Sequence, residues 1–245
     1  MKILSYIKYF FYLAWNWNIS IAWHIIRQEI KGEKKYGINT TGADELKKLE
    51  DMGIDISHAT IYMPASYKLL EDIFEQLSPN KSQTYPKRSR RTNLKLILSA
   101  AEGQTSNHFL DIGCGKGRAL CVAAHYGYKK LTGIDLSKEF CAVAKENVVL
   151  TKQKIPGINF TIINNDAFYF EIPDDVDCIF LFNPFDETIM SGVVENILES
   201  LQNHPRKMNI IYVNPLHKEY FIQAGFTETW HSKKMKYLEA VILEK

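Results

Sequence analysis

The sequence predicts an α/β protein with a doubly wound, mostly parallel seven-stranded sheet, an antiparallel last strand and an N-terminal helical extension. Two observations carry this prediction. From residue 109 onward, short apolar segments of strand length alternate with longer helical segments, a pattern typical of a parallel sheet covered on both faces. After the last helical segment, FTETWHSKKMKYLEAVILEK (226–245) contains two consecutive strand-like segments, which predict an antiparallel end to the sheet.

The apolar runs and turn residues give the bounds of each element. The predicted strands are 109–112, 131–135, 159–163, 177–182 and 209–213, followed by the two in the C-terminal segment. The predicted helices between them are 118–126, 138–151, 187–201 and 218–224. Upstream, Pro64 precedes an amphipathic helix that ends at Ser78-Pro79, and residues 43–53 and 93–101 are two further short helices.

The N-terminal region differs in composition from the rest. Residues 1–30 are predicted to be helical and the polar segment 31–42 to be a linker. We therefore expect residues 1–58 to form a helical extension with its linker, and residues 59–245 to form the α/β domain. The chain contains 245 residues, of which 46% are hydrophobic and 24% charged, which is ordinary for a globular protein of this organisation.

Residues 9–26 carry no formal charge and come close to the roughly 20 apolar residues that span a bilayer core. Polar residues interrupt them and no small-residue cleavage site follows, which argues against a signal peptide. Three alternatives remain open. The segment packs on the domain or on a second copy of the chain, lies at a membrane surface with its tryptophans at the headgroups and lysines beside it, or spans the membrane.

Charge and cysteine content exclude several classes of function. The net charge of +2 is too small to predict a nucleic-acid-binding protein. The four cysteines are scattered in apolar or helical segments, which favours buried free thiols and a cytosolic, reducing compartment. No His, Cys or Asp cluster has the spacing of a metal site, so no metal is predicted.

The segment HFLDIGCGKGRAL (108–120) places three glycines between a predicted strand and a predicted helix. Glycines at this position allow a tight turn and a close approach of the backbone to a ligand. The dinucleotide fingerprint is G-x-G-x-x-G, whereas here Gly117 arrives one residue early and Asp111 lies two residues before Gly113. Further polar residues end the next strands: Asp135, Asp166 and Asn183. These strand ends form the edge at which open α/β sheets bind ligands.

The pattern D-x-G-x-G-x-G resembles motif I of the class I, Rossmann-like, S-adenosylmethionine-dependent methyltransferases. This resemblance implies S-adenosylmethionine as the cofactor. It implies that Gly113, Gly115 and Gly117 approach the methionine end, with Asp111 near its ammonium. Asp135 would then accept hydrogen bonds from the ribose and Asp166 from the adenine amino group. The remaining residues implied at the cofactor are Leu136, Ala167 and Asn183.

Each of these residues also has a structural alternative, which the sequence leaves open. Asp135 could be the N-cap of the following helix, and Asp166 could cap a turn. Phe168 could lie against the adenine ring or in the core, and Asn183-Pro184 could be an ordinary break after a strand.

Two further segments suggest the methyl acceptor. Asn183-Pro184-Phe185 resembles the (D/N)-P-P-(Y/F) motif of amino-group methyltransferases but lacks its second proline. The resemblance implies a nitrogen acceptor whose hydrogen bonds are accepted by the Asn183 side chain and a proline carbonyl, with Phe185 packed beside it. Tyr62 and Pro64 form a Y-x-P element similar to that of seven-strand protein-lysine methyltransferases, which implies that Tyr62 lines the site. We therefore expect Asn183, Pro184, Phe185 and Tyr62 to present the acceptor, and the resemblance suggests that this acceptor is a protein lysine.

Other functions remain alternatives at this point. They are a small-molecule or saccharide methyltransferase of the same fold, a nicotinamide-dependent oxidoreductase, and a non-catalytic cofactor-binding or membrane-associated module. The basic run 87–91 is either a solvated helix entrance or a contact for an acidic substrate or lipid headgroup. Residues 1–30 are the expected contact for a membrane surface or a second copy of the chain.

Overall fold

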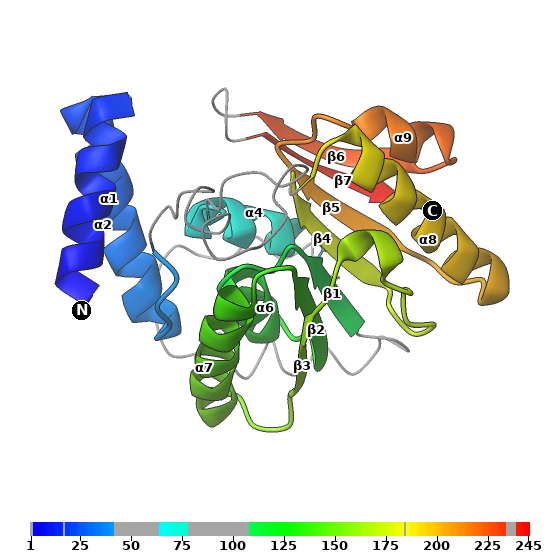
Figure 1. The fold of residues 1–245 in the computed structure, drawn as a ribbon, viewed down its shortest axis with the longest axis horizontal. Coiled ribbons are helices and arrows are strands. Elements are labelled where there is room, and N and C mark those ends of the chain that lie inside the picture. Colours follow the sequence, from blue (N-terminus) through cyan, green and yellow to red (C-terminus); the bar gives the residue numbers. More distant parts are fainter. Residues whose placement is uncertain (1, 17, 42–63, 78–107, 184, 234–238) are drawn as a thin grey trace.

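The computed structural model describes residues 2–16, 18–41, 64–77, 108–183, 185–233 and 239–245. The helices expected at 43–53 and 93–101, the basic run 87–91, Tyr62 and Pro184 lie outside these residues. The described chain forms a central sheet with helices on both faces and a pair of N-terminal helices standing to one side (Figure 1).

The sheet has seven strands in the order β3-β2-β1-β4-β5-β7-β6. Their bounds are β1 His108–Ile112, β2 Lys130–Asp135, β3 Asn159–Asn164, β4 Cys178–Phe182, β5 Asn209–Val213, β6 Thr227–Lys233 and β7 Glu239–Glu244. The strands β1 to β5 pair in parallel, and β7 pairs antiparallel with both β5 and β6. The predicted doubly wound sheet with an antiparallel end is confirmed.

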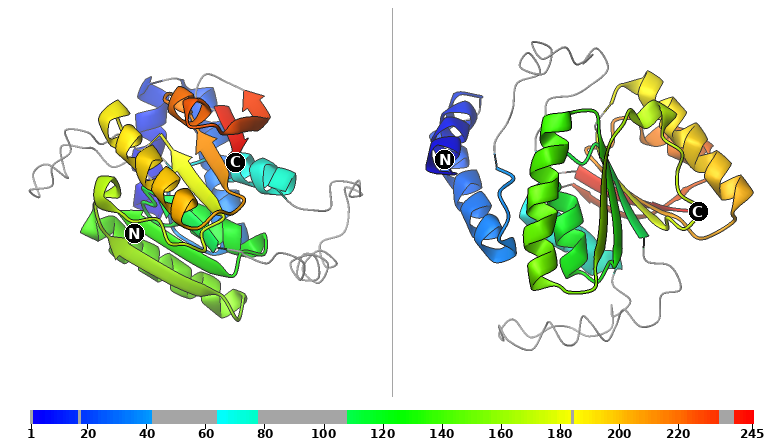
Figure 2. Two further views of the ribbon diagram at one scale, coloured as in Figure 1. Left: turned by 90° about the vertical axis from the view of Figure 1, so that its right-hand side faces the viewer. Right: turned by 60° about the horizontal axis from the view of Figure 1, so that its bottom comes forward.

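Alternate residues along each strand point to opposite faces, and each face has its own hydrophobic core. Phe109 of β1 belongs to the cluster that packs against α4, α6 and α7, whereas Leu110 belongs to the cluster under α8 and α9. The helix bounds are α4 Tyr67–Leu77, α6 Arg118–His125, α7 Lys138–Lys154, α8 Glu187–Asn203 and α9 Lys218–Gln223. Figure 2 shows the sheet between these two helical layers.

The N-terminal region consists of two helices, α1 (Lys2–Asn16) and α2 (Ile19–Tyr36), rather than the single helix expected over residues 1–30. Asn18 caps α2 by accepting a hydrogen bond from the backbone N–H of Ile21 at 2.8 Å. The linker expected from residue 31 is also wrong, because α2 continues to Tyr36 and ends at Gly37, whose φ is 72°. Glycine is the usual residue at such a left-handed helix end.

We refer to α1 and α2 together as the N-terminal hairpin, because they lie side by side (Figure 1). Tyr9 and Leu13 of α1 are buried with Ala22 and Ile26 of α2 in a small core of their own. Within the described residues, no helix has both the length and the hydrophobicity that crossing a bilayer requires. All four cysteines are free and buried, as the sequence predicted.

Candidate active site

The glycine loop joins β1 to α6 in a tight turn. Gly113, Gly115 and Gly117 have φ angles of 77°, 52° and 78°, in the left-handed region that residues with a Cβ rarely adopt. The backbone N–H groups of Gly113 and Cys114 both donate to the carbonyl oxygen of Ile134 on β2, each at 2.9 Å. The loop is therefore held against the neighbouring strand.

The far end of the loop is held by α7. Gly117 is the N-cap of α6, and a Cβ added at this position would lie 3.2 Å from the Cβ of Ala144. The side chain of Asn147 donates a hydrogen bond to the carbonyl oxygen of Lys116 at 2.9 Å. The close approach of α7 therefore favours glycine at position 117 for space as well as for conformation.

Asp111 lies on β1, two residues before the loop, and is only 2% exposed. Burial raises the pKa of its carboxyl group well above the usual range, and the nearby charge of Asp135 raises it further. No described residue donates a hydrogen bond to this carboxylate. Burying a charged carboxylate is unfavourable unless an opposite charge pairs with it, so this position suits a ligand that brings an ammonium group to it.

Asp135 ends β2 and connects it to the glycine loop. Its Oδ2 accepts from the backbone N–H of Gly115 and its Oδ1 from that of Ser137, both at 2.8 Å. Burial raises the pKa of Asp135, and these two hydrogen bonds oppose that rise. The alternative of Asp135 as a helix cap is wrong, because Ser137 is the N-cap of α7. A carboxylate offers about four lone pairs, so both oxygens retain the capacity to accept from a ligand.

Asp166 follows β3 and caps a short 3₁₀ helix, η2 (Ala167–Tyr169). Its Oδ1 accepts a hydrogen bond from the backbone N–H of Phe168 at 2.9 Å, so the turn-capping alternative is correct for this oxygen. The Phe168 ring lies against α8, where a Cβ on Gly192 would come within 2.6 Å of it. Phe168 is half-buried and packs on this helix, and its contact with an adenine ring stays a prediction.

Asn183 follows β4 in a conformation that is unusual for a residue with a side chain. Its φ is 35° and it is buried. Its Oδ1 accepts a hydrogen bond from the hydroxyl of Tyr212 on β5 at 3.2 Å, and that hydroxyl oxygen accepts from the backbone N–H of His217 at 3.3 Å. Burial raises the pKa of Tyr212 to about 12, so the phenol stays protonated and fixes the direction of the Asn183 amide.

The strand order brings these residues to one edge of the sheet. The strands β3, β2, β1 and β4 are neighbours, and parallel strands present their carboxyl ends at the same edge. Asp166, Asp135, Asp111 and Asn183 therefore follow one another along this edge. The chain reverses its direction of winding between β1 and β4, and such a switch point is the usual ligand site of open α/β sheets.

The remaining predicted site residues have mixed environments. Leu136 is exposed, Ala167 is buried, and Phe185 is half-buried against the cluster under α8. Tyr62 and Pro184 lie outside the described residues. Within the described part of the chain, no group of three or more His, Cys, Asp or Glu side chains could hold a metal ion.

Sequence reasoning missed an ion pair behind the glycine loop. Arg118, the first residue of α6, contacts Glu29 of α2 through two parallel hydrogen bonds, Nη1–Oε1 at 3.0 Å and Nη2–Oε2 at 2.5 Å. Its Nε donates to Thr40 Oγ1 at 2.8 Å, and the guanidinium lies 4.1 Å from the centroid of the Tyr67 ring. Both charged side chains are buried, so α2 helps to fix the start of α6.

A second acid of α2 completes this network. Glu33 Oε1 accepts from the backbone N–H groups of Thr40 and Thr41, each at 2.7 Å, and from the Thr41 hydroxyl at 2.6 Å. Its other oxygen accepts from the hydroxyl of Tyr6 on α1. The only sequence signal for this network is the spacing of Glu29 and Glu33, which places both acids on one face of a helix.

Comparison with known proteins agrees with this arrangement. Residues 109–205, which include the glycine loop and the strand ends described above, match the family model described as a methyltransferase domain. This match assigns a methyltransferase domain to residues 109–205, which make up less than half of the chain. No curated protein matches the sequence.

Several solved methyltransferase structures are similar to this chain. A putative methyltransferase from Escherichia coli is 11% identical with a TM-score of 0.46, covering 73% of this chain and 86% of that one. A SAM-dependent methyltransferase from Aquifex aeolicus is 18% identical with a TM-score of 0.42, covering 71% and 97%. A ribosomal protein L11 methylase from Lactobacillus delbrueckii subsp. bulgaricus is 15% identical with a TM-score of 0.42, covering 62% and 74%.

Proposed function

We propose that this protein is an S-adenosylmethionine-dependent methyltransferase that transfers the methyl group to a nitrogen acceptor, and that the acceptor is the side-chain amine of a protein lysine. Asn183 carries the proposal, because its buried amide lies at the carboxyl end of β4 and its direction is fixed by Tyr212. A side-chain carbonyl oxygen accepts hydrogen bonds from N–H groups. It can therefore orient an amine so that the nitrogen lone pair points along the line of transfer.

The same proposal assigns the cofactor to the edge formed by β3, β2, β1 and β4. Asp111 would pair with the ammonium of the methionine moiety, which supplies the positive charge that its buried carboxylate lacks. Asp135 would accept from the ribose hydroxyls while keeping its bonds to Gly115 and Ser137. The proposed cofactor set is Asp111, Gly113, Gly115, Gly117, Asp135, Leu136, Asp166, Ala167 and Asn183.

Methyl transfer to an amine requires little acid–base catalysis by the protein. When bound, S-adenosylmethionine supplies a methyl group that its sulfonium already activates. The acceptor nitrogen must be neutral, so an ammonium first loses a proton to water. Transfer would then form the bond between nitrogen and the methyl carbon and leave the electron pair of the broken S–C bond on sulfur. The chain's own contribution is alignment and exclusion of water, for which Asn183 and Phe185 are the proposed residues.

Radiolabelled methyl transfer to a cell lysate tests this proposal. The variant Asn183→Gly removes the amide while it tolerates the positive φ, and Asn214→Gly is a matched control, because Asn214 also has a positive φ of 50° at the end of β5. We expect Asn183→Gly to bind S-adenosylhomocysteine more weakly than the wild type in calorimetry, because Asn183 belongs to the proposed cofactor set. At saturating cofactor it should still label about 100-fold more slowly, the scale of a misaligned reacting group. Asn214→Gly is expected to stay close to the wild type.

The labelled product identifies the acceptor. After acid hydrolysis, the proposal expects the label in methylated lysine from the protein fraction. Label confined to small molecules or saccharides would refute the lysine assignment, and unchanged labelling by Asn183→Gly would remove the amide from catalysis. If the wild-type protein does not bind S-adenosylhomocysteine at all, the proposed cofactor residues are refuted.

A further inference from the structure

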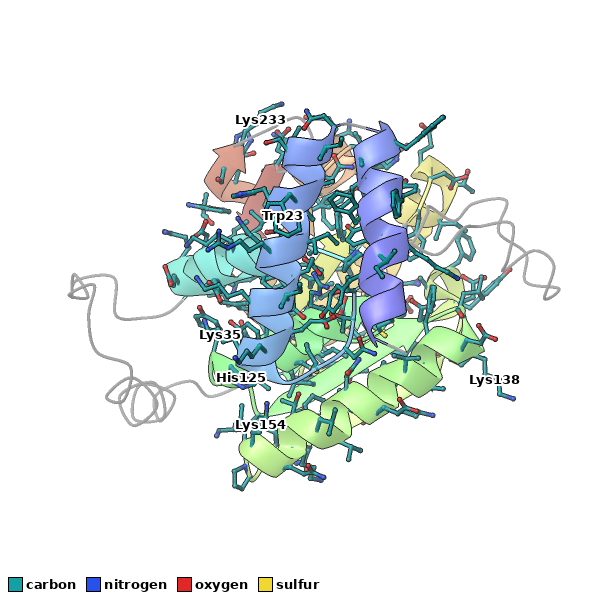
Figure 3. All side chains as sticks on the ribbon, turned by 90° about the vertical axis from the view of Figure 1, so that its left-hand side faces the viewer. Trp23, Lys35, His125, Lys138, Lys154 and Lys233 are labelled. Atoms are coloured by element: carbon teal, nitrogen blue, oxygen red, sulfur yellow. The ribbon has the colours of Figure 1, made fainter. Side chains whose placement is uncertain are left out.

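The N-terminal hairpin exposes large apolar side chains along one stripe of each helix. On α1, Ile7, Phe11 and Trp15 follow one another at intervals of four residues, and on α2 Ile19, Trp23 and Ile30 keep a similar spacing, so each set lies on one side of its helix. Trp15 is 92% exposed, Ile19 71% and Phe11 66%. Figure 3 looks at the hairpin with the sheet behind it and shows Trp23 on α2.

Most of these side chains lie outside the hairpin's own core, although the Trp23 ring contacts the Phe10 ring of α1 edge to face with centroids 6.4 Å apart. Its two helices are held together by the core of Tyr9, Leu13, Ala22 and Ile26. The hairpin is held to the domain by Glu29, which is paired with Arg118. A rigid helix pair thus presents an apolar, aromatic surface, and contiguous surfaces of this kind mark interaction sites.

The charges on the same surface are all positive. Lys8, Arg27, Lys31 and Lys34 are exposed beside the apolar stripes. The acids of the hairpin, Glu29 and Glu33, are 5% and 4% exposed and face the buried network. Within residues 6–15 and 18–36, the exposed charges are therefore exclusively cationic.

We infer that this outer face of the N-terminal hairpin, formed by the apolar side chains Ile7, Phe11, Trp15, Ile19, Trp23 and Ile30 with Lys8, Arg27, Lys31 and Lys34, binds the surface of an anionic lipid bilayer. Aromatic side chains favour the headgroup level, and basic residues beside them are attracted to anionic lipids. Two copies of this face would bring like charges together, which disfavours a second copy as the occupant. The helices would lie along the surface, with the cofactor edge outside the bilayer.

Flotation of the full chain with lipid vesicles tests this inference. We expect binding to vesicles of phosphatidylglycerol and phosphatidylcholine, weak binding to pure phosphatidylcholine, and release at high salt, because screening shortens the range of attraction to about 3 Å at 1 M. Phe11→Ser with Trp15→Ser, and separately Lys31→Glu with Lys34→Glu, should each weaken binding by about tenfold or more. Val149→Ser, an exposed apolar residue of α7, is the matched control and should bind as the wild type does.

Three outcomes would overturn the inference. They are no binding to anionic vesicles, equal binding to anionic and neutral vesicles, and a stable dimer without lipid that Phe11→Ser with Trp15→Ser dissociates. Light scattering of each variant detects the dimer, and circular dichroism shows whether the variants keep the fold. Methyl transfer does not enter these measurements, so their outcome is independent of the proposed acceptor.

Discussion

Glu29 and Arg118 form a bidentate, buried ion pair across 89 positions of the sequence. Glu29 belongs to the N-terminal hairpin, and Arg118 is the residue that follows the glycine loop. The pair therefore connects a segment outside the matched methyltransferase region with the turn proposed to hold the cofactor. This connection makes the hairpin a structural part of the site.

Glu29→Gln should destabilise the protein strongly. Removing one partner of a buried ion pair leaves the other charge uncompensated, at a cost of about 3–5 kcal/mol. Urea unfolding of the two proteins measures the difference. Lys35→Met is the matched control, because it breaks the exposed pair between Lys35 and Glu71, whose contribution should not exceed about 1 kcal/mol. A Glu29→Gln protein within 1 kcal/mol of the wild type would show that Arg118 does not depend on this partner.

Gly117→Ala should be more damaging than Gly157→Ala. Both glycines have a positive φ, 78° and 81°, so alanine costs about 1–2 kcal/mol at either position through backbone strain. At Gly117 the new Cβ also meets the Cβ of Ala144 at 3.2 Å, whereas at Gly157 nothing lies within 4 Å. Each variant lowers the free energy of unfolding relative to the wild type, and the difference between these two losses measures the contact with α7. Equal losses in the free energy of unfolding would mean that α7 shifts to accommodate the new Cβ without destabilising the protein.

Asp111→Asn should stabilise the cofactor-free protein while it weakens cofactor binding. The folded state raises the pKa of Asp111, so the folded protein holds a proton that the unfolded chain releases. Stability is then lost as the pH rises from the unfolded value of 3.8 toward the raised pKa, and asparagine removes this loss. Thermal melting across pH 4–8 checks the sign.

Calorimetry with S-adenosylhomocysteine completes that comparison. Losing a charge-assisted hydrogen bond to the ammonium should weaken binding by roughly tenfold to a hundredfold. A variant that is more stable and binds as tightly as the wild type would show that Asp111 is buried for a reason other than the cofactor.

Acid should destabilise the opposite edge of the sheet, where His108 contacts Asp175 at 2.9 Å. Burial alone would raise the pKa of Asp175, but hydrogen bonds from Lys130 and His108 outweigh it and lower the pKa to about 2. A depressed carboxyl pKa stabilises the fold above the unfolded value of 3.8, and this contribution is lost as the pH falls toward 2.

Burial lowers the pKa of His108 below its usual 6.5, against the hydrogen bond that its ring donates to Asp175. Its contribution is therefore also lost as the pH falls below 6.5. Melting temperatures between about pH 4 and pH 2, the window of the Asp175 titration, should drop less steeply in Asp175→Asn than in the wild type. Parallel curves for the two proteins would assign the acid sensitivity to other groups.

The strands and the polar residues at their ends could be predicted because both depend on local sequence. A buried parallel strand is a short apolar run, so its end, and with it Asp111, Asp135 and Asn183, can be read directly. The partners of these side chains could not be predicted. The hydrogen bond from Tyr212 to Asn183 and that from Gly115 to Asp135 join residues 29 and 20 positions apart, and local sequence does not specify such contacts.

The end of α2 could not be predicted from local sequence either. Gly32 and the charged residues around it suggested a linker, yet the helix continues to Tyr36. A Cβ at Gly32 would lie 2.1 Å from the Tyr67 ring, so this glycine makes room for the packing of α4. The charged residue at position 33 is compatible with a buried helix position because Glu33 accepts hydrogen bonds there from Thr40 and Thr41. Both features depend on segments that come later in the chain.

The buried ion pair also sets an order of events during synthesis on the ribosome. Translation adds roughly 5–20 residues per second, so the 89 positions between Glu29 and Arg118 correspond to roughly 4–18 s of elongation. During that interval the carboxylate of Glu29 has no guanidinium to pair with and stays hydrated. The inner side of α2 can therefore dock only after the nascent chain has passed the glycine loop, although α2 itself emerges much earlier.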